Sequence, residues 1–243
     1  RDISTSPRSI WKSFSEKERE KLEHIQKAAE QAEALTRQLL TFSRKQIVQK
    51  RILNVNTVIN DSLKILKRLI GENISVVLYL DEQLQNIKAD HHQIEQVLMN
   101  LLLNARDAVN SREDQTGKKI TIQTGMVHFD GTPVRDGLTI EAGHYIMLSV
   151  SDNGIGMEST VVKRIFEPFF TTKGIGRGTG LGLSTIYGII RQNNARITVY
   201  SEPGKGTTFN VYWKVADSEE EKAANKPDME LAPGAEHVLL VED

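Results

Sequence analysis

Hydrophobic positions recur with two different periods along this chain, and these periods predict its helices and strands. Between residues 15 and 42, apolar residues return every three or four positions among charged and amide residues, which is typical of a helix with one apolar seam. The segment SEKE (15–18) fits a capping box, so the helix is predicted to begin near Ser15. Because a single seam must pack against another helix, we expect a hairpin partner that this sequence does not contain.

The remainder of the chain mixes both periods and predicts an α+β sandwich, since strands and helices are segregated along it. The two predicted strands 118–129 and 144–152 are expected to be antiparallel neighbours. Residues 216–236 are polar and contain prolines, as a flexible linker does. The predicted helices are 54–70, 91–110 and 183–193, and the predicted strands are 74–80, 87–90, 118–129, 144–152, 195–202 and 206–215.

Composition excludes several classes of function. The 243 residues are 39% hydrophobic and 26% charged, as in ordinary globular proteins, and suffice for one sizeable domain with a smaller element. A net charge of -1 gives no general attraction to nucleic acid or to a membrane surface. The absence of cysteine excludes disulfides and cysteine nucleophiles, and no apolar run could span a bilayer. We therefore expect a cytoplasmic chain, with any membrane anchor elsewhere in a parent protein.

An aspartate and a glycine-rich turn follow the predicted strand 144–152. In DNGIGM (152–157), the carboxylate of Asp152 can accept a hydrogen bond from an exocyclic amine, and Gly154 and Gly156 let the backbone approach a flat ring. The same residues also suit an ordinary Asp-Asn-Gly turn. The motif alone leaves both interpretations open.

Two asparagines interrupt the apolar helix predicted over 91–110. Asn100 and Asn104 are four residues apart and therefore lie on one face of this helix. Burial of an unsatisfied amide costs about 1–3 kcal/mol. Each amide is therefore expected to be paired within the protein or to present its oxygen to a ligand or a cation.

A run of glycines, GIGRGTGLGLS (174–184), opens the helix predicted over 183–193. Successive glycines expose backbone amides that can surround a phosphate at a helix N-terminus. The run is not a P-loop, because no Gly-Lys-Ser/Thr ends it, and it does not fit the dinucleotide GxGxxG pattern. Lys173 and Arg177 flank the glycines as candidate phosphate cations or as ordinary solvated side chains.

In their order and spacing, these motifs resemble the nucleotide-binding boxes of the histidine kinase branch of the gyrase, heat-shock chaperone, histidine kinase and MutL ATPase superfamily. The resemblance implies the Bergerat ATP-binding fold, a two-layer α/β sandwich with a mixed sheet, helices on one face and a mobile ATP lid. The matching segments are the N box NLLLNA (100–105), the G1 box DNGIG (152–156), the F box FEPFF (166–170), the G2 box GTGLGL (178–183) and the glycine turn GKGTTF (204–209).

The resemblance also implies ATP and Mg²⁺ as cofactors and assigns roles to individual residues. Asn104 would coordinate the metal, with Asn100 beside it as a candidate catalytic group. Asp152 would bind the adenine amine, and Gly154 and Gly156 would admit the purine. The residues that would contact the phosphates are Lys173, Arg177, Gly178, Gly180, Leu181 and Gly182.

One position separates the branches of this superfamily. Hydrolysing relatives have a glutamate base four residues before the metal asparagine, where this chain has Asn100. The difference favours phosphotransfer to a histidine over hydrolysis, and Glu95 is too far along the helix to replace that base. Asp107 stands where many kinases have a phosphate-binding lysine. An ATPase switch and a non-catalytic nucleotide-binding module are the alternative hypotheses.

The resemblance finally divides the chain into parts of a hybrid kinase. Residues 1–50 would be the second helix of a dimerisation hairpin, 51–215 the ATP-binding catalytic domain, 216–236 a linker and 237–243 the start of a receiver domain. The expected partners are an acceptor-histidine hairpin, the receiver domain and a second copy in a homodimer. Since no acceptor motif is found, we expect the fragment to bind nucleotide without phosphorylating itself.

Overall fold

The computed structural model describes residues 48–112, 117–131, 140–174 and 178–216. Contacts divide the chain into two units, a larger one of residues 49–164 with 186–243 and a smaller one of residues 1–48 with 165–185. The predicted helical seam of residues 15–42 and the segment 217–243 lie outside the described residues.

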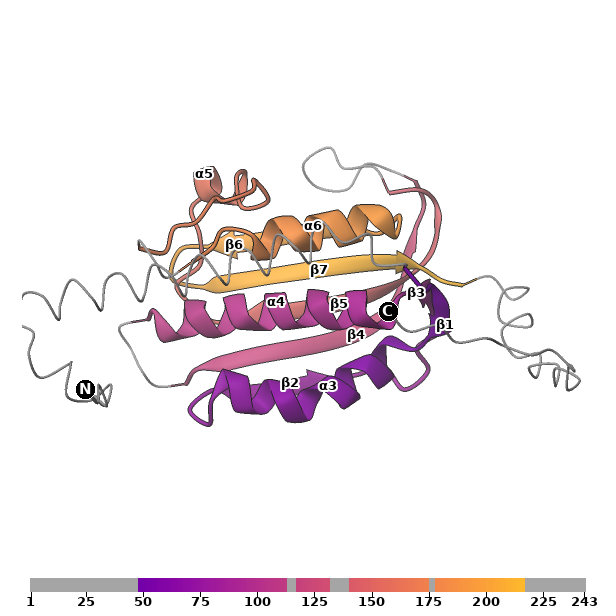
Figure 1. The fold of residues 1–243 in the computed structure, drawn as a ribbon, viewed down its shortest axis with the longest axis horizontal. Coiled ribbons are helices and arrows are strands. Elements are labelled where there is room, and N and C mark those ends of the chain that lie inside the picture. The colour runs from indigo at the N-terminus through magenta and orange to yellow at the C-terminus, as the bar shows by residue number, and fades with distance from the viewer. Residues whose placement is uncertain (1–47, 113–116, 132–139, 175–177, 217–243) are drawn as a thin grey trace, which may run out of the picture. The chain divides into compact units, whose positions relative to one another are not determined.

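The larger unit is built on a five-stranded sheet with the order β2-β4-β5-β7-β6 (Figure 1). Three long strands form its centre and are antiparallel: β4 (Lys119–Phe129), β5 (Gly143–Asp152) and β7 (Gly206–Lys214). At one edge β6 (Arg196–Glu202) is antiparallel to β7, and at the other β2 (Ser75–Tyr79) is parallel to β4. The predicted mixed sheet is therefore confirmed.

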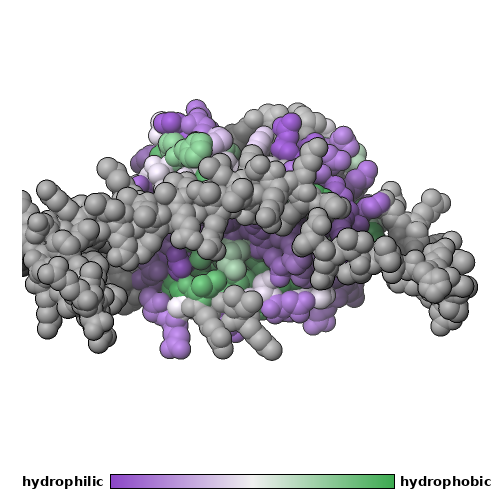
Figure 2. Space-filling view, viewed as in Figure 1, coloured by the Kyte–Doolittle hydropathy of each residue, from purple (hydrophilic) through white to green (hydrophobic). Residues whose placement is uncertain are grey.

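Helices α3 (Val55–Ile70) and α4 (His91–Asn110) cover one face of this sheet (Figure 1). Each begins at a side-chain cap: Asn54 accepts from the Asn56 N–H, and Asp90 accepts from two N–H groups of the first turn of α4. The third predicted helix is α6 (Gly182–Gln192). Among the coloured atoms of Figure 2, hydrophilic ones predominate, and apolar ones gather over α4 and near α5.

The core lies between the sheet and the helices. Alternate positions of β5, from Ile146 to Val150, are buried against the helices, and Asp152 is the next residue on the same face. The pattern that packs the strand therefore also directs this carboxylate toward the helical layer. The fully buried sheet residues include Ile120, Ile122, Ile146, Leu148, Val150, Val211 and Trp213, and those of α4 are Ile94, Val97, Leu98, Leu101, Leu102 and Val109.

Three short elements complete the described structure. The predicted short strand is β3 (Ile87–Ala89), which pairs with β1 (Arg51–Leu53) in a separate antiparallel ladder. Helix α5 (Ser159–Val162) follows β5. Hydrophobic periodicity did not predict β1 or α5, because three or four residues are too few to show a period. None of the described helices is long and apolar enough to cross a membrane.

Candidate functional site

The N-box helix α4 presents two half-buried amides on one face. Asn100 and Asn104 are spaced one turn apart, at the border of the apolar positions that contact the core. Among the described residues, the Asn104 side chain has no hydrogen-bond partner. Its carbonyl oxygen can therefore serve as a ligand for a cation or a polar group.

Asp152 is the buried acid of the site and is only 8% exposed. Its Oδ1 accepts a hydrogen bond of 2.8 Å from the Gly154 N–H, and the Thr207 N–H also donates to the carboxylate. Burial raises the pKa of Asp152 to about 6, although these two N–H groups oppose the shift. At neutral pH the group is thus an ionised and poorly hydrated acceptor, which suits it to an N–H donor on a ligand.

The G1 turn packs directly on the C-terminal half of α4. The Ile155 N–H donates to the Ala108 carbonyl at 3.2 Å. A Cβ atom on Gly154 would lie 2.5 Å from the Ala108 carbonyl carbon and 2.7 Å from Asp152 Oδ1. Glycine is therefore required here for backbone packing, whatever ligand the turn admits.

The glycine turn between β6 and β7 packs against the same G1 turn. Gly206 has φ +104°, and a Cβ atom on it would lie 2.0 Å from the Asp152 carbonyl oxygen. Gly156 has φ +65°, and its Cβ would lie 1.9 Å from the Glu202 carbonyl oxygen. The Gly204 N–H also donates to the Ile155 carbonyl at 2.7 Å. The sequence predicts a hairpin turn for this segment, GKGTTF (204–209), which is also the last box of the resemblance. The structure shows that the turn supports Asp152.

Asn153 ties the end of β5 to the start of β4, and sequence reasoning gave it no role. Its amide donates to the Gly117 carbonyl at 2.7 Å and accepts from the Lys119 N–H at 2.9 Å. Its own carbonyl accepts from Arg112 Nη1 at 2.9 Å. The partners are more than thirty residues away in sequence, so only the fold reveals this support of Asp152.

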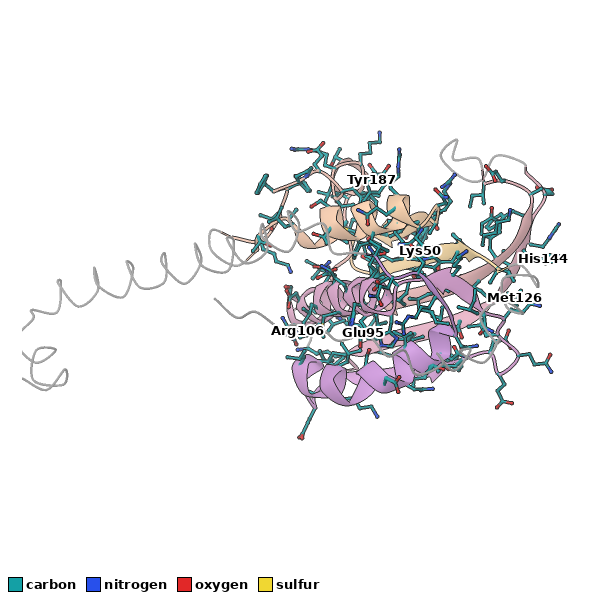
Figure 3. The ribbon with its side chains drawn as sticks, turned by 45° about the vertical axis from the view of Figure 1, so that its right-hand side comes forward. Lys50, Glu95, Arg106, Met126, His144 and Tyr187 are labelled. Atoms are coloured by element: carbon teal, nitrogen blue, oxygen red, sulfur yellow. The ribbon has the colours of Figure 1, made fainter. Side chains whose placement is uncertain are left out.

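Asp107, where the resemblance implies a lysine in many kinases, is paired with a cation. Arg106 donates from Nε and Nη2 to Asp107 Oδ1 at 2.9 and 2.7 Å. Its Nη1 donates to the Leu69 carbonyl at the end of α3, at 3.1 Å. The arginine thus joins α3 to α4 and compensates the charge of Asp107. Figure 3 shows Arg106 and Glu95 at different points along α4.

In the smaller unit, the F box and the G2 box contact each other. The Phe169 N–H donates to the Gly180 carbonyl at 3.0 Å, and Phe169 itself has φ 66°. Gly180 has φ +66°, and its Cβ would lie 2.3 Å from the Phe169 carbonyl carbon. A Cβ on Gly178 would lie 2.6 Å from Thr171 Oγ1. The lid glycines therefore allow close packing within this unit.

The predicted site residues thus fall into two groups. Asn100, Asn104, Asp152, Gly154 and Gly156 belong to the larger unit, where the G1 turn contacts the N-box helix. The other predicted residues belong to the smaller unit and are Lys173, Gly178, Gly180, Leu181 and Gly182, while Arg177 lies outside the described residues.

Comparison with known proteins identifies the family. The family model "Histidine kinase-, DNA gyrase B-, and HSP90-like ATPase" matches residues 89–217, just over half of the chain. The sensor kinase CckA of Brucella abortus (strain 2308) is 38% identical over 90% of this chain and 24% of its own length. The signal transduction histidine-protein kinase AtoS of Escherichia coli (strain K12) is 33% identical over 79% and 28%. This chain spans about a quarter of the length of these two relatives.

Solved structures agree with this result. The nucleotide-free catalytic domain of histidine kinase ThkA matches with a TM-score of 0.52 and 26% identity, over 69% of this chain and 96% of that one. Full-length ShkA in complex with AMPPNP matches in fold with a TM-score of 0.62 at 19% identity, over 85% of this chain and 40% of that one. The chain therefore belongs to the family of histidine kinase-, DNA gyrase B- and HSP90-like ATPases, with sensor histidine kinases as its relatives.

Proposed function

We propose that this chain binds Mg-ATP and transfers the γ-phosphate to a histidine on a dimerisation hairpin, as part of a two-component signalling protein. The main observation in support is Asp152, a buried carboxylate at the end of β5 that faces the helical layer. Membership of an ATPase family, together with relatives named as sensor kinases, supports ATP as the ligand of this carboxylate.

In this proposal Asp152 accepts a hydrogen bond from the adenine amino group. A buried ionised carboxylate loses hydration, and an N–H donor from a ligand replaces it. ShkA, which shares the fold, was solved in complex with AMPPNP, an adenine nucleotide analogue, and this agrees with an adenine ligand. Gly154 and Gly156 hold the turn that places the carboxylate and would lie along the purine.

Asn104 is the residue proposed to bind the magnesium ion. Mg²⁺ is usually held by one or two protein oxygens together with phosphate oxygens and water. A half-buried amide without a protein partner fits that role, and the described residues contain no larger cluster of acidic or histidine ligands. When bound, the ion neutralises charge on the phosphates. The lid residues Lys173, Arg177, Gly178, Gly180, Leu181 and Gly182 would contact the phosphates.

The geometry of α4 favours phosphotransfer over hydrolysis. Its two acids are Glu95 and Asp107. Nine residues separate Glu95 from Asn104, which at about 100° per residue places them on opposite faces of the helix. Glu95 instead contacts His91 and His92 at 3.4 and 3.2 Å. Asp107 is on the same side of the helix as Asn104, but its carboxylate is paired with Arg106. With Asn100 in the base position of the hydrolases, neither acid of α4 is placed there as a base for a water molecule.

Partners and location follow from the same proposal. Residues 1–50 would belong to a dimerisation hairpin whose acceptor histidine is supplied by another segment. Residues 51–215 would form the catalytic domain, 216–236 a linker and 237–243 the start of a receiver domain. The parent protein would act as a homodimer with its catalytic domains in the cytoplasm, where ATP is available.

Calorimetric titration with a non-hydrolysable ATP analogue tests the nucleotide site. We expect Mg-dependent binding that Asp152→Asn weakens by about tenfold to a hundredfold, and Asp61→Asn, on the exposed side of α3, is the matched control. Unchanged affinity of Asp152→Asn would refute the assignment of the site.

Phosphotransfer to a separately supplied acceptor hairpin tests the reaction. We expect phosphorylation of the hairpin histidine with little release of inorganic phosphate. Steady ATP hydrolysis without transfer would instead favour an ATPase switch, and nucleotide binding with neither reaction would favour a binding module.

A further inference from the structure

Two histidines face each other at the end of the β4–β5 ladder that is distant from Asp152. His128 and His144 are direct partners in this antiparallel pair, so their side chains lie on the same face of the sheet. Both are exposed, and their ring centroids are 4.7 Å apart with an interplanar angle of 49°. Eight residues of strand, about 27 Å, separate His144 from Asp152. Figure 3 shows His144 at the edge of the molecule, well away from Arg106.

The separation of the two rings matches chelation of one metal ion. Imidazole nitrogen binds Zn²⁺ at about 2.0–2.1 Å, which puts the ring centroid about 3.2 Å from the metal. Two such rings have centroids about 4.5 Å apart at a 90° angle between ligands, and about 5.2 Å apart at a tetrahedral angle. The observed 4.7 Å lies inside this range. A small rotation of two exposed rings would suffice to point a nitrogen of each at a common centre.

The strands that bear the pair are held together by aromatic packing. Phe129, next to His128, makes edge-on contacts with Tyr145 and Tyr212, with ring centroids 5.3 and 5.2 Å apart. These contacts connect β4, β5 and β7 at the level of the two histidines. The spacing of the pair is therefore set by the sheet before any ion binds, which lowers the entropic cost of chelation.

We propose that His128 and His144 form a binding site for a divalent transition-metal ion such as Zn²⁺, Ni²⁺ or Cu²⁺. Imidazole is a preferred ligand of these ions, whereas Mg²⁺ prefers oxygen. No described group contains three or more acidic, cysteine or histidine ligands, so water completes the coordination of an ion held by two side chains. The ion would cross-link β4 and β5 and would be independent of the nucleotide site.

The pair His91 and His92 offers an internal control. Their ring centroids are 5.8 Å apart and nearly perpendicular, which is outside the chelating range. They are successive residues of a helix and so point about 100° apart. Both also contact Glu95.

Calorimetric titration of the tag-free 243-residue chain with Zn²⁺ alone tests the proposal. We expect His128→Gln and His144→Gln each to weaken binding on the order of tenfold or more, since loss of a metal ligand costs at least as much as loss of a supporting residue. The double variant His91→Gln/His92→Gln should bind as the unmodified chain does, and excess Mg²⁺ should not compete. Zn²⁺ affinity in His128→Gln or His144→Gln equal to that of the unmodified chain, or loss of binding in the double variant His91→Gln/His92→Gln, would overturn the proposal.

A second measurement requires no variant. Substoichiometric Cu²⁺ should broaden the backbone amide NMR signals around His128 and His144 first, because a paramagnetic ion acts only on nearby nuclei. Broadening confined to other parts of the chain would contradict the assignment. Asp152→Asn should leave Zn²⁺ binding intact, so failure of the metal site and failure of the proposed nucleotide site are separate results.

Discussion

The substitution Asp152→Asn should separate nucleotide binding from stability. In the folded protein this carboxylate is 8% exposed, with the N–H groups of Gly154 and Thr207 as donors. Asparagine has nearly the same shape and keeps one carbonyl oxygen for these donors, but it has no charge to bury. We therefore expect a variant that binds its ligand more weakly while its fold becomes more stable at neutral pH.

The size of the effect follows from the pKa of Asp152, which burial raises from 3.8 to about 6. Each tenfold change in proton affinity corresponds to 1.36 kcal/mol, so this rise in pKa means that ionised Asp152 costs the folded state about 3 kcal/mol. The folded state binds the proton more tightly than the unfolded chain, so this group adds stability below about pH 4. That stability is lost as the pH rises through about 6. Between about pH 5 and pH 7.5 the loss amounts to roughly 1 kcal/mol.

Chemical denaturation at these two pH values measures the effect. The unmodified chain should lose roughly 1 kcal/mol more of unfolding free energy between the lower and the higher pH than Asp152→Asn does. At the higher pH the variant should be the more stable of the two. Affinity for the ATP analogue should fall by about tenfold to a hundredfold, the value of a hydrogen bond to a charged group.

Two results would refute this reasoning. Parallel pH dependences for the two proteins would mean that Asp152 is not a buried ionised group. A variant less stable than the unmodified chain at the higher pH would mean that the hydrogen bonds to the carboxylate outweigh its desolvation. Asp61→Asn, on the surface of α3, should show neither change.

Three further substitutions test the surroundings of Asp152. Asn104→Ala should abolish Mg-dependent nucleotide binding with little change in the unfolding midpoint, because its side chain has no partner among the described residues; a large loss of stability would assign it a packing role. Asn153→Ala removes two side-chain hydrogen bonds and should destabilise the fold by about 1–3 kcal/mol, with weaker nucleotide binding measured by calorimetry. Gly206→Ala should lower the unfolding free energy by about 1–3 kcal/mol through backbone strain at φ +104°, and further because its Cβ would clash with the Asp152 carbonyl. A Cβ on Gly204 would have nothing within 4 Å, so melting curves of Gly206→Ala that match those of Gly204→Ala would contradict the role of the close contact.

The pairing of Arg106 with Asp107 bears on the absence of the lysine that the resemblance implies at position 107. The carboxylate is compensated by its neighbour and joined to the end of α3, so it adds no uncompensated negative charge near the proposed metal ligand Asn104. The cations proposed for the phosphates therefore remain those of the lid, Lys173 and Arg177.

Local patterns in the sequence were sufficient to predict most elements. The helix predicted over 91–110 is α4 (His91–Asn110), and the strands predicted over 118–129 and 144–152 are β4 and β5. Each of these segments is long enough to show its hydrophobic period, and the spacing of the hydrophobic residues predicts which side is buried. The N, G1, F and G2 boxes and the last glycine turn likewise predicted the family. Each is a short run of adjacent residues and can be recognised without the fold.

Tertiary structure alone decided which distant residues meet. Gly206 reaches the backbone of Asp152, and Asn153 bonds to residues around Gly117, although nothing in the local sequence names these partners. The elevated pKa of Asp152 depends on burial by several elements at once. The register that opposes His128 to His144 is set by strand pairing. Periodicity fixes the face that a segment buries, but partners and desolvation depend on segments far away in the chain, so only the folded structure determines them.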